Sequence, residues 1–260
     1  SRPERFAKAL ASAADAIVLD LEDAVAAEAK GAARDAVASW AAGAAPVERA
    51  RIVVRLNDAA SPYFAEDLRM LREACLPVVM LPKAENDEAL GAVRAGLPGA
   101  RLLPLVETVR GIAQCDAVAA GVGVVRLVFG TLDFALDLDL DIDADNEPLA
   151  EAAARLALAS RLAGRLTPVA GVTPQIDDEP RLLADLTWAR RRGFGAKLCI
   201  HPRQVAPLHA ALAPDAATLD WARRVLAAEA SSPGAAKLDG RMVDRPVVLQ
   251  AQRTLARAGL

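Results

Sequence analysis

The stretch that decides the fold reads Ala16-Ile17-Val18-Leu19-Asp20-Leu21-Glu22-Asp23. Its apolar part is too short for a helix and runs into acidic residues, which is typical of a buried strand followed by a polar turn. Parallel strands between layers of helices have this pattern, because both faces of the sheet are covered. We therefore interpret the stretch as one strand of a parallel sheet whose carboxyl end carries polar side chains.

Six further apolar runs of the same kind follow. Together with the first run, the predicted strands are Ala16–Leu21, Ile52–Leu56, Val78–Leu81, Leu102–Val106, Leu127–Phe129, Val169–Val172 and Lys197–Ile200. Amphipathic segments with helix-start signals lie between them, such as Tyr63–Ala74 after Ser61-Pro62 and Arg181–Arg192 after residues 177–180. The alternation of strand and helix predicts an α/β fold of the TIM (β/α)₈ barrel type.

A barrel of this type has eight strands, whereas the pattern supplies seven. The first predicted helix, Glu4–Ala14, has no strand before it, so we expect that the first barrel strand is missing from this sequence. After the last strand, helices are predicted at Arg203–Ala211, Pro214–Ala230 and Arg245–Ala258. The predicted organisation is a catalytic barrel over residues 1–212 and a C-terminal helical extension, or lid, over residues 213–260.

Composition and charge exclude several classes of function. The 260 residues carry a formal net charge of −3 with interleaved signs, which leaves no basic stripe for nucleic acid. No apolar run approaches the roughly 20 residues that span a bilayer. Three cysteines, Cys75, Cys115 and Cys199, lack metal-ligand spacing and are predicted to be buried thiols in a reducing compartment. We expect a cytoplasmic protein that acts on a small molecule.

Polar residues directly after the predicted strands are the first candidates for a site, because active sites of TIM barrels lie at the carboxyl ends of the strands. The residues at these positions are mostly acidic: Asp20, Glu22, Asp23, Arg55, Asn57, Lys83, Glu85, Glu107, Asp133 and His201. Several carboxylates at one rim would repel each other unless a cation lay among them. A divalent metal ion resolves this repulsion.

Glu107 and Asp133 form the best pair of metal ligands. Each follows a predicted strand directly, and the two strands are adjacent, so their carboxylates meet at the rim. Two carboxylates with open water positions suit Mg²⁺, whereas the two histidines of the chain, His201 and His209, argue against zinc. A lone acid could instead be a helix N-cap or a solvated loop charge; the convergence of several acids favours the metal site.

Three further rim residues have open alternatives. Arg55 ends an apolar strand and either pairs with a rim carboxylate or binds an anionic substrate through its planar guanidinium. Lys83 is either a salt-bridge partner of the acids, which we favour, or a Schiff-base lysine. His201 is as well suited to a structural hydrogen bond as to catalysis.

These residues lie inside longer strings that resemble the citrate lyase beta-subunit family, within the HpcH/HpaI aldolase group. The strings are Arg2-Pro3-Glu4-Arg5-Phe6-Ala7-Lys8-Ala9, Leu19-Asp20-Leu21-Glu22-Asp23-Ala24-Val25, Val54-Arg55-Leu56-Asn57, Met80-Leu81-Pro82-Lys83, Pro104-Leu105-Val106-Glu107-Thr108, Phe129-Gly130-Thr131-Leu132-Asp133-Phe134, Ile200-His201-Pro202 and Asp239-Gly240-Arg241-Met242-Val243-Asp244. Each string alone is weak, but all eight occur in the order of the family. The sequence departs from the family by lacking an opening strand before Arg2.

The resemblance implies roles for individual residues. Glu107 and Asp133 look like the Mg²⁺ ligands, with Glu107 also facing the substrate, and Arg55 looks like the clamp of the substrate's carboxylate or oxo group. The remaining implied site residues are Glu22 and Asp23, which hold metal-bound water; Arg2 and Lys8, which contact the phosphates of coenzyme A; and Asp244, a tail aspartate that serves as acid or base. In some relatives that aspartate enters a neighbouring subunit's site, which implies a homo-oligomer, a trimer or hexamer.

The implied activity is carbon–carbon lyase chemistry. A citryl-, citramalyl- or malyl-thioester would be cleaved to an acyl thioester and an oxo acid, or formed from them in the reverse reaction. The acyl carrier would be coenzyme A or an acyl carrier protein. The alternatives are an aldolase that releases pyruvate from a free hydroxy-oxo acid, hydrolysis of a malyl thioester, and a non-catalytic metabolite-binding subunit. Relatives of the aldolase type carry an early histidine, and none precedes His201 here.

Overall fold

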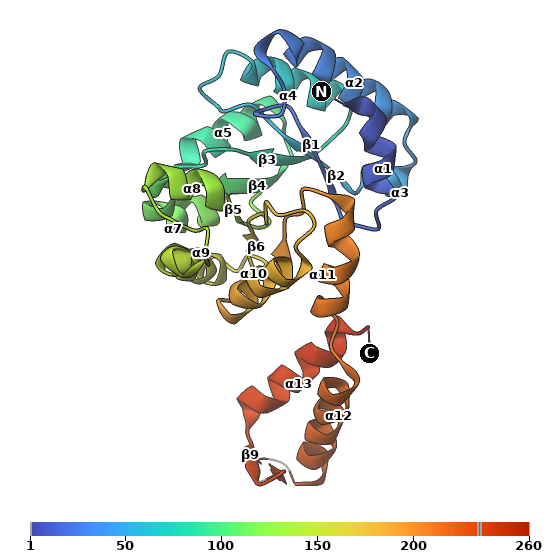
Figure 1. Cartoon of the computed structure of the whole chain (residues 1–260), viewed down its shortest axis with the longest axis vertical. Coiled ribbons are helices and arrows are strands. Elements are labelled where there is room, and N and C mark those ends of the chain that lie inside the picture. The colour runs from blue at the N-terminus through green and yellow to red at the C-terminus, as the bar shows by residue number, and fades with distance from the viewer. Residues whose placement is uncertain (1, 233, 235, 260) are drawn as a thin grey trace. The chain divides into compact units, whose positions relative to one another are not determined.

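The computed structural model describes residues 2–232, 234 and 236–259. The chain divides into two compact units, residues 1–205 and residues 206–260 (Figure 1). No helix in the described part of the chain is long and apolar enough to cross a membrane.

The first unit is built on one sheet of seven parallel strands. The strands are β1 (Ile17–Asp20), β2 (Ile52–Arg55), β3 (Val78–Leu81), β4 (Arg101–Val106), β5 (Val128–Phe129), β6 (Val169–Ala170) and β7 (Ala196–Lys197). They pair in chain order, so β1 and β7 are the edges of the described sheet. In the register of the first pair, Asp20 lies opposite Arg55, which brings two polar side chains to the same end of the sheet.

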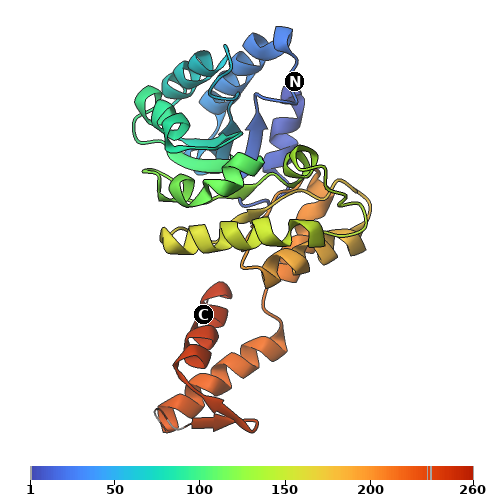
Figure 2. The ribbon, with the colours of Figure 1, turned by 90° about the vertical axis from the view of Figure 1, so that its left-hand side faces the viewer.

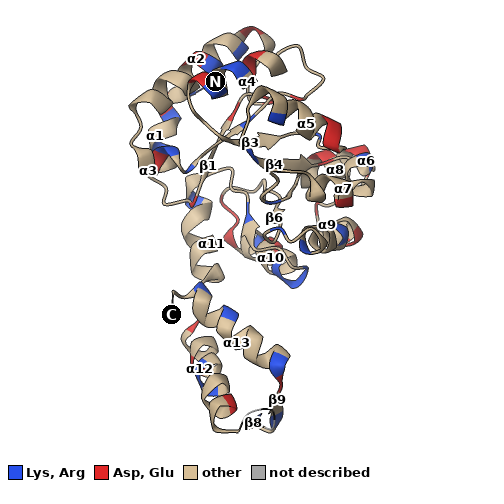
Figure 3. Cartoon of the chain, turned by 180° about the vertical axis from the view of Figure 1, so that it is seen from behind, with Lys and Arg blue, Asp and Glu red and all other residues tan. Residues whose placement is uncertain are grey.

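Helices connect the strands and cover the outer face of the curled sheet (Figures 1 and 2). The α-helices of this unit are α1 (Phe6–Leu10), α2 (Lys30–Gly43), α3 (Pro46–Arg49), α4 (Phe64–Glu73), α5 (Asp87–Gly96), α6 (Val109–Ala113), α7 (Cys115–Ala120), α8 (Thr131–Asp137), α9 (Ala150–Leu162) and α10 (Glu179–Arg191). Short 3₁₀ turns lie at η1 (Pro3–Arg5), η2 (Ala27–Ala29), η3 (Glu147–Leu149) and η4 (Pro202–Gln204). Both charge signs are distributed over these helices (Figure 3). The α/β, TIM-barrel-like fold class is confirmed.

The two faces of the sheet carry separate apolar clusters. The larger cluster packs the sheet against the helices and includes Val54, Val106 and Phe129. The smaller cluster lies on the inner face and consists of Val53, Met80, Leu105, Val128 and Val169. Neighbouring residues of a strand point to opposite faces, so Arg55 and Glu107, which follow Val54 and Val106, point to the inner face. The fold therefore delivers these two polar side chains to the end of the barrel interior.

Each predicted apolar run forms a strand, with differences at the ends. The last run was predicted as Lys197–Ile200, but β7 ends at Lys197. The backbone N–H of Ile200 donates to the side-chain oxygen of Gln204 at 3.0 Å, so it takes no part in a strand ladder. The first predicted helix, Glu4–Ala14, is formed by η1 and α1 and ends at Leu10.

The second unit is mainly helical, as predicted. Its helices are α11 (Val205–Leu212), α12 (Ala216–Ser231) and α13 (Arg245–Arg257), and α11 begins at the boundary between the two units. The unit also contains an antiparallel hairpin of β8 (Ala236–Leu238) and β9 (Arg241–Val243). The hairpin was not predicted. Its turn residues Asp239 and Gly240 have φ angles of 51° and 77°, the conformation that favours Asp-Gly in two-residue hairpin turns. An apolar cluster within the unit joins both strands to the helices, through Ala222, Val225, Ala236, Val243 and Ala251.

The prediction of three buried thiols was wrong for two of them. Cys115 is buried, whereas Cys75 and Cys199 are exposed. Cys75 follows the end of α4 with a φ of 53°, the left-handed conformation common just after a helix. Such helix ends lie at the surface, which accounts for its exposure.

Candidate active site

Arg55 is the last residue of β2, and its side chain lies on the inner face of the sheet. Its Nε donates to Asp20 Oδ1 at 2.8 Å and its Nη2 donates to Asp20 Oδ2 at 2.5 Å, the two-point geometry that makes such pairs strong. Burial alone would raise the pKa of Asp20. The Arg55 guanidinium and the backbone N–H groups of Glu22 and Ala24 outweigh burial and hold that pKa below its ordinary value. Asp20 is thus an ionised anchor that fixes the plane of the guanidinium.

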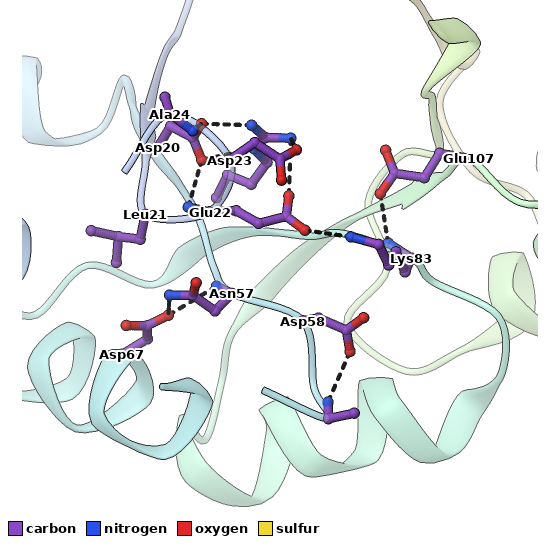
Figure 4. A network of polar contacts seen from close by, with 12 residues as sticks. Asp20, Leu21, Glu22, Asp23, Ala24, Asn57, Asp58, Asp67, Lys83 and Glu107 are labelled. Atoms are coloured by element: carbon purple, nitrogen blue, oxygen red, sulfur yellow. Dashed lines mark hydrogen bonds and ion pairs between the residues drawn. The ribbon is translucent and has the colours of Figure 1, made fainter. Parts of the chain in front are cut away.

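The turn after β1 carries two more carboxylates, those of Glu22 and Asp23 (Figure 4), and both reach Arg55. Arg55 Nη1 lies 3.0 Å from Glu22 Oε2 and 3.4 Å from Asp23 Oδ2. Glu22 Oε2 is buried and makes no hydrogen bond of good geometry, so this ion pair is its polar contact within the described residues. Burial raises the pKa of Glu22 above its ordinary value, although Lys83 and Arg55 oppose the change. Arg55 therefore pairs with rim carboxylates, one of the two roles considered for it.

Lys83 connects Glu22, in the turn after β1, with Glu107, which follows β4. Its Nζ donates to Glu22 Oε1 at 2.8 Å, and its backbone N–H donates to Glu107 Oε1 at 2.9 Å. Lys83 makes both bonds with a φ of 47°, a left-handed conformation that costs a residue with a Cβ about 1 kcal/mol. Burial alone would lower the pKa of Lys83, but the carboxylates, Glu22 above all, raise it above its ordinary value. A Schiff base requires the neutral amine, so the structure favours the salt-bridge interpretation.

Glu107 is the most buried carboxylate of the rim, at 3% exposure. Burial raises its pKa to about 7; the backbone N–H of Lys83 opposes this change, and the charges of Asp133 and Glu22 add to it. Asp133 lies in the first turn of α8 and is exposed. Burial is thus the main reason why the pKa of Glu107 is raised, and the charge of Asp133 adds to it. A cation bound by both carboxylates would relieve this repulsion.

Gly130 allows the main chain to pass directly against Glu107. A Cβ at Gly130 would lie 2.4 Å from Glu107 Cβ and 2.6 Å from Glu107 Oε2. Gly130 is also the N-cap of α8, the helix that carries Asp133 in its first turn, so this close approach lies directly before that turn. A larger residue would have to move the Glu107 carboxylate or the start of α8.

We expect Gly130→Ala to lower the free energy of unfolding by about 1–3 kcal/mol, the usual cost of adding a methyl group to a packed site. Glu107 should move with it, so binding of a divalent cation should weaken. Urea denaturation and calorimetric titration with Mg²⁺ measure the two effects. The control is Gly31→Ala, where no atom lies within 4 Å of the new Cβ and a helical glycine is replaced, so stability should rise by about 0.5–1 kcal/mol. Unchanged stability of Gly130→Ala would contradict the packing argument.

Glu107 and Asp133 fit a hard cation on the chemistry of their donors. Both supply carboxylate oxygens, the ligands that Mg²⁺ prefers, and Mg²⁺ usually retains several waters. Within the described residues, no three Asp, Glu, His or Cys side chains are grouped as a larger ligand set. Waters and substrate oxygens would therefore complete the coordination of the metal ion. A substrate could then bind to the metal directly, as metal-assisted chemistry requires.

Other predicted site residues lie apart from this network or show structural contacts. Arg2 and Lys8 are exposed at the start of the chain, in η1's cap and in α1. Asp244 belongs to the second unit, where its side chain accepts the backbone N–H of Val247 at 3.2 Å and caps α13. His201 Nδ1 accepts the backbone N–H of Arg203 at 3.2 Å, the structural role considered for it.

Two residues that hold the site in place were not among the predicted functional residues. Asp20, predicted only to lie at the rim, makes the best hydrogen bonds of Arg55. Asp67, which is fully buried, accepts the backbone N–H and the side-chain amide of Asn57 at 2.9 and 2.7 Å and an Arg34 hydrogen bond at 3.1 Å. The sequence does contain one signal for Asp67, because a charged residue lies there on the otherwise apolar face of α4.

Residues 1–202 match the HpcH/HpaI aldolase/citrate lyase family. Over 263 residues the chain is 38% identical to a citrate lyase subunit beta-like protein of Mycobacterium tuberculosis, which covers 99% of this chain and 92% of that protein. Over 262 residues it is 34% identical to a (3S)-malyl-CoA thioesterase of Cereibacter sphaeroides, which covers 99% of this chain and 91% of the thioesterase.

The fold is similar to that of a solved relative as well. The crystal structure of CitE from Mycobacterium tuberculosis in complex with magnesium, acetoacetate and coenzyme A superposes with a TM-score of 0.88 at 36% sequence identity. The match covers 100% of this chain and 95% of that chain. Sequence and structure comparisons therefore agree over nearly the full length of both proteins.

Proposed function

The chain belongs to the HpcH/HpaI aldolase/citrate lyase family, as its sequence motifs predicted, and on this premise we propose that it is a magnesium-dependent carbon–carbon lyase. The proposed substrate is a β-hydroxyacyl thioester of coenzyme A, such as citryl-, citramalyl- or malyl-CoA, cleaved to an acyl thioester and an oxo acid. The observation that carries the proposal is the rim itself, where buried Glu107 accepts the Lys83 backbone N–H and Arg55 pairs with Asp20 and Glu22. The charge of Asp133 adds to the raised pKa of Glu107 at the same rim. Magnesium and coenzyme A in the solved relative support it.

The chain's own residues would share the work as follows. Glu107 and Asp133 would hold Mg²⁺, which when bound supplies positive charge beside the oxygen on which charge develops. Arg55, held rigid by Asp20, would orient the carboxylate or oxo group of the substrate through its remaining N–H groups. Glu22 and Asp23 would orient water at the metal site, since outer carboxylates commonly fix the position of ligands.

Cleavage also needs a group that takes the proton of the β-hydroxyl as the carbon–carbon bond breaks and then gives a proton to the acyl enolate that leaves. We assign this role to Asp244. A site shared between subunits would bring Asp244 of one chain to the rim of another in a homo-oligomer, a trimer or hexamer. Arg2 and Lys8 would contact the phosphates of coenzyme A. An acyl carrier protein in place of coenzyme A, and a cytoplasmic location, stay predictions.

Hydrolysis is the second candidate, supported by the (3S)-malyl-CoA thioesterase at 34% identity. A hydrolase would cleave the thioester bond instead of the carbon–carbon bond and release free coenzyme A. Release of pyruvate from a free hydroxy-oxo acid and non-catalytic metabolite binding rank lower, because the rim acids and Arg55 are all present and early histidines are absent from the sequence.

The deciding experiment is an assay of citramalyl-, malyl- and citryl-CoA, beside a free hydroxy-oxo acid, with and without a chelator. Free thiol and oxo acid are measured in parallel, with a thiol reagent and by hydrazone formation. Metal-dependent release of an oxo acid, without release of free thiol, would support the lyase. Release of free thiol, without an oxo acid, would support the hydrolase. No turnover of any thioester, with pyruvate from the free acid, would overturn the proposal.

Magnesium affinity is expected to depend on pH through Glu107. Because its pKa is raised to about 7, protons and Mg²⁺ compete for the same carboxylate below that pH. The association constant should rise about tenfold per pH unit up to about pH 6.5 and level off above about pH 7.5, measured by titration calorimetry. Glu85→Gln, which removes a carboxylate bonded to Thr108, should keep this dependence. An affinity that does not change with pH would contradict the role of Glu107.

Lys83 offers a test that separates its backbone from its side chain. Lys83→Gly and Lys83→Met both remove the ion pair with Glu22 and keep the N–H that binds Glu107, so both should lower kcat about 10–100-fold. Lys83→Gly should be more stable than Lys83→Met by about 1 kcal/mol, because glycine adopts the left-handed conformation without strain. A borohydride-stable adduct at Lys83 of the unmodified protein would instead establish the Schiff base.

A further inference from the structure

A buried lysine lies beneath the turn that carries Glu22 and Asp23. Lys30 Nζ donates to the backbone oxygens of Leu21 and Glu22, both at 2.7 Å. Lys30 is 8% exposed, and its Nζ lies 5.7 Å from the centroid of the Tyr63 ring. Both hydrogen bonds go to main-chain atoms, so this lysine holds the path of the turn itself.

The position is unfavourable for a cation. Lys30 is the first residue of α2, where the helix dipole opposes a positive charge, and burial removes the water that would hydrate the ammonium. The structure places no carboxylate in an ion pair with Lys30 among the described residues. Two carbonyl oxygens and an aromatic ring offset these costs. An apolar side chain would fill the same space without these costs. What the ammonium adds over an apolar side chain is therefore its two hydrogen bonds to the carbonyls of the turn.

The turn is held from its other side by Asp20. Asp20 Oδ1 accepts the N–H of Glu22 at 2.8 Å, and Asp20 Oδ2 accepts the N–H of Ala24 at 3.1 Å. Both oxygens of Asp20 also bind Arg55. Lys30 thus fixes the carbonyls of the turn while Asp20 fixes its N–H groups, and the side chain of Glu22 emerges between them toward Arg55 and Lys83.

We infer that Lys30 is a positioning residue of the active site. Its ammonium sets the orientation of the peptide groups at Leu21 and Glu22, and through them the positions of the Glu22 and Asp23 carboxylates and of Arg55. The link to catalysis rests on the proposed function, whereas the link from Lys30 to the geometry of Arg55 does not.

The test compares Lys30→Met with Arg51→Met in the full-length protein. Arg51 makes a matched control, because its Nη2 also donates to two backbone oxygens, those of Leu10 and Ala14, but before β2, at the end of the strand opposite Arg55. The readout is the Nε–H resonance of Arg55 in ¹⁵N-labelled protein, assigned by its loss in Arg55→Lys, together with kcat and KM for the thioester that is turned over.

We expect Lys30→Met to lose or shift the Arg55 Nε–H resonance and to lower kcat about 10–100-fold, with KM changed less than about threefold. Arg51→Met should keep both the resonance and kcat, even where it unfolds at a lower temperature. In Lys30→Ala, propylammonium or butylammonium should restore the resonance and the rate, and tetramethylammonium, which has no N–H, should not.

An unchanged Arg55 resonance in folded Lys30→Met would overturn the inference, as would equal losses in Lys30→Met and Arg51→Met. A lost resonance in a protein whose unmodified form turns over no thioester would support the role of Lys30 and refute the proposed function. Should Lys30→Met fail to fold, Lys30→Gln, which is shorter and uncharged but retains two N–H donors, is measured in the same way.

Discussion

Asp133→Ala is expected to lower metal-dependent turnover by at least about 1,000-fold. A bound metal ion contributes several kcal/mol to the stabilisation of developing charge, and each factor of ten in rate corresponds to about 1.4 kcal/mol. Asp133 is exposed in the first turn of α8, so its removal should leave folding nearly unchanged. The measurements are kcat, Mg²⁺ affinity by calorimetry, and the unfolding midpoint in urea.

The matched control is Asp116→Ala, which removes an exposed acid from the first turn of α7. It should leave turnover and Mg²⁺ affinity unchanged. A second readout follows from the charge interaction at the site: without Asp133, the pKa of Glu107 should fall below its value of about 7. Normal activity of Asp133→Ala would refute the assignment of the metal ligands.

The sequence was most informative where hydrophobic pattern and register determine the result. Seven apolar runs formed seven parallel strands because each needs cover on both faces. The polar residue after each run then had to lie at the same end of the sheet. Glu22, Arg55, Lys83 and Glu107 do lie at one rim, where two hydrogen bonds and one ion pair connect them.

The residues that hold this rim in place could not be predicted in the same way. Lys30 and Asp67 are helix residues whose burial depends on other segments of the chain. Lys30 binds two backbone oxygens, and Asp67 binds one backbone N–H and the side chains of Asn57 and Arg34. None of these pairings has a signature in the sequence. The left-handed conformation of Lys83, which accompanies its hydrogen bonds to two carboxylates, likewise has no signature in the sequence. The hairpin of the second unit, in contrast, had a visible signal in Asp239-Gly240 that helical propensity on both sides concealed.

Asp244→Asn is expected to lower kcat about 100- to 10,000-fold, the usual contribution of an acid or base. Asparagine caps helices as well as aspartate does, so the bond to the Val247 N–H, and with it α13, should survive. Asp215→Asn is the control: Asp215 caps α12 through the N–H of Thr218 at 2.7 Å, and its replacement changes the same charge in the same kind of position. If both variants lose activity equally, Asp244 is a structural cap and the acid lies elsewhere.

Whether Asp244 serves its own barrel or a neighbour's can be decided by mixing two inactive variants. Asp133→Ala lacks the metal ligand and Asp244→Asn lacks the acid, so neither forms a working site alone. In randomly mixed cyclic oligomers, about one quarter of shared sites would combine an intact Asp133 with a neighbour's intact Asp244. Co-refolding the two variants should therefore restore about a quarter of the unmodified activity if the site is shared. No recovery, in an oligomer shown to contain both chains, would mean that each chain completes its own site.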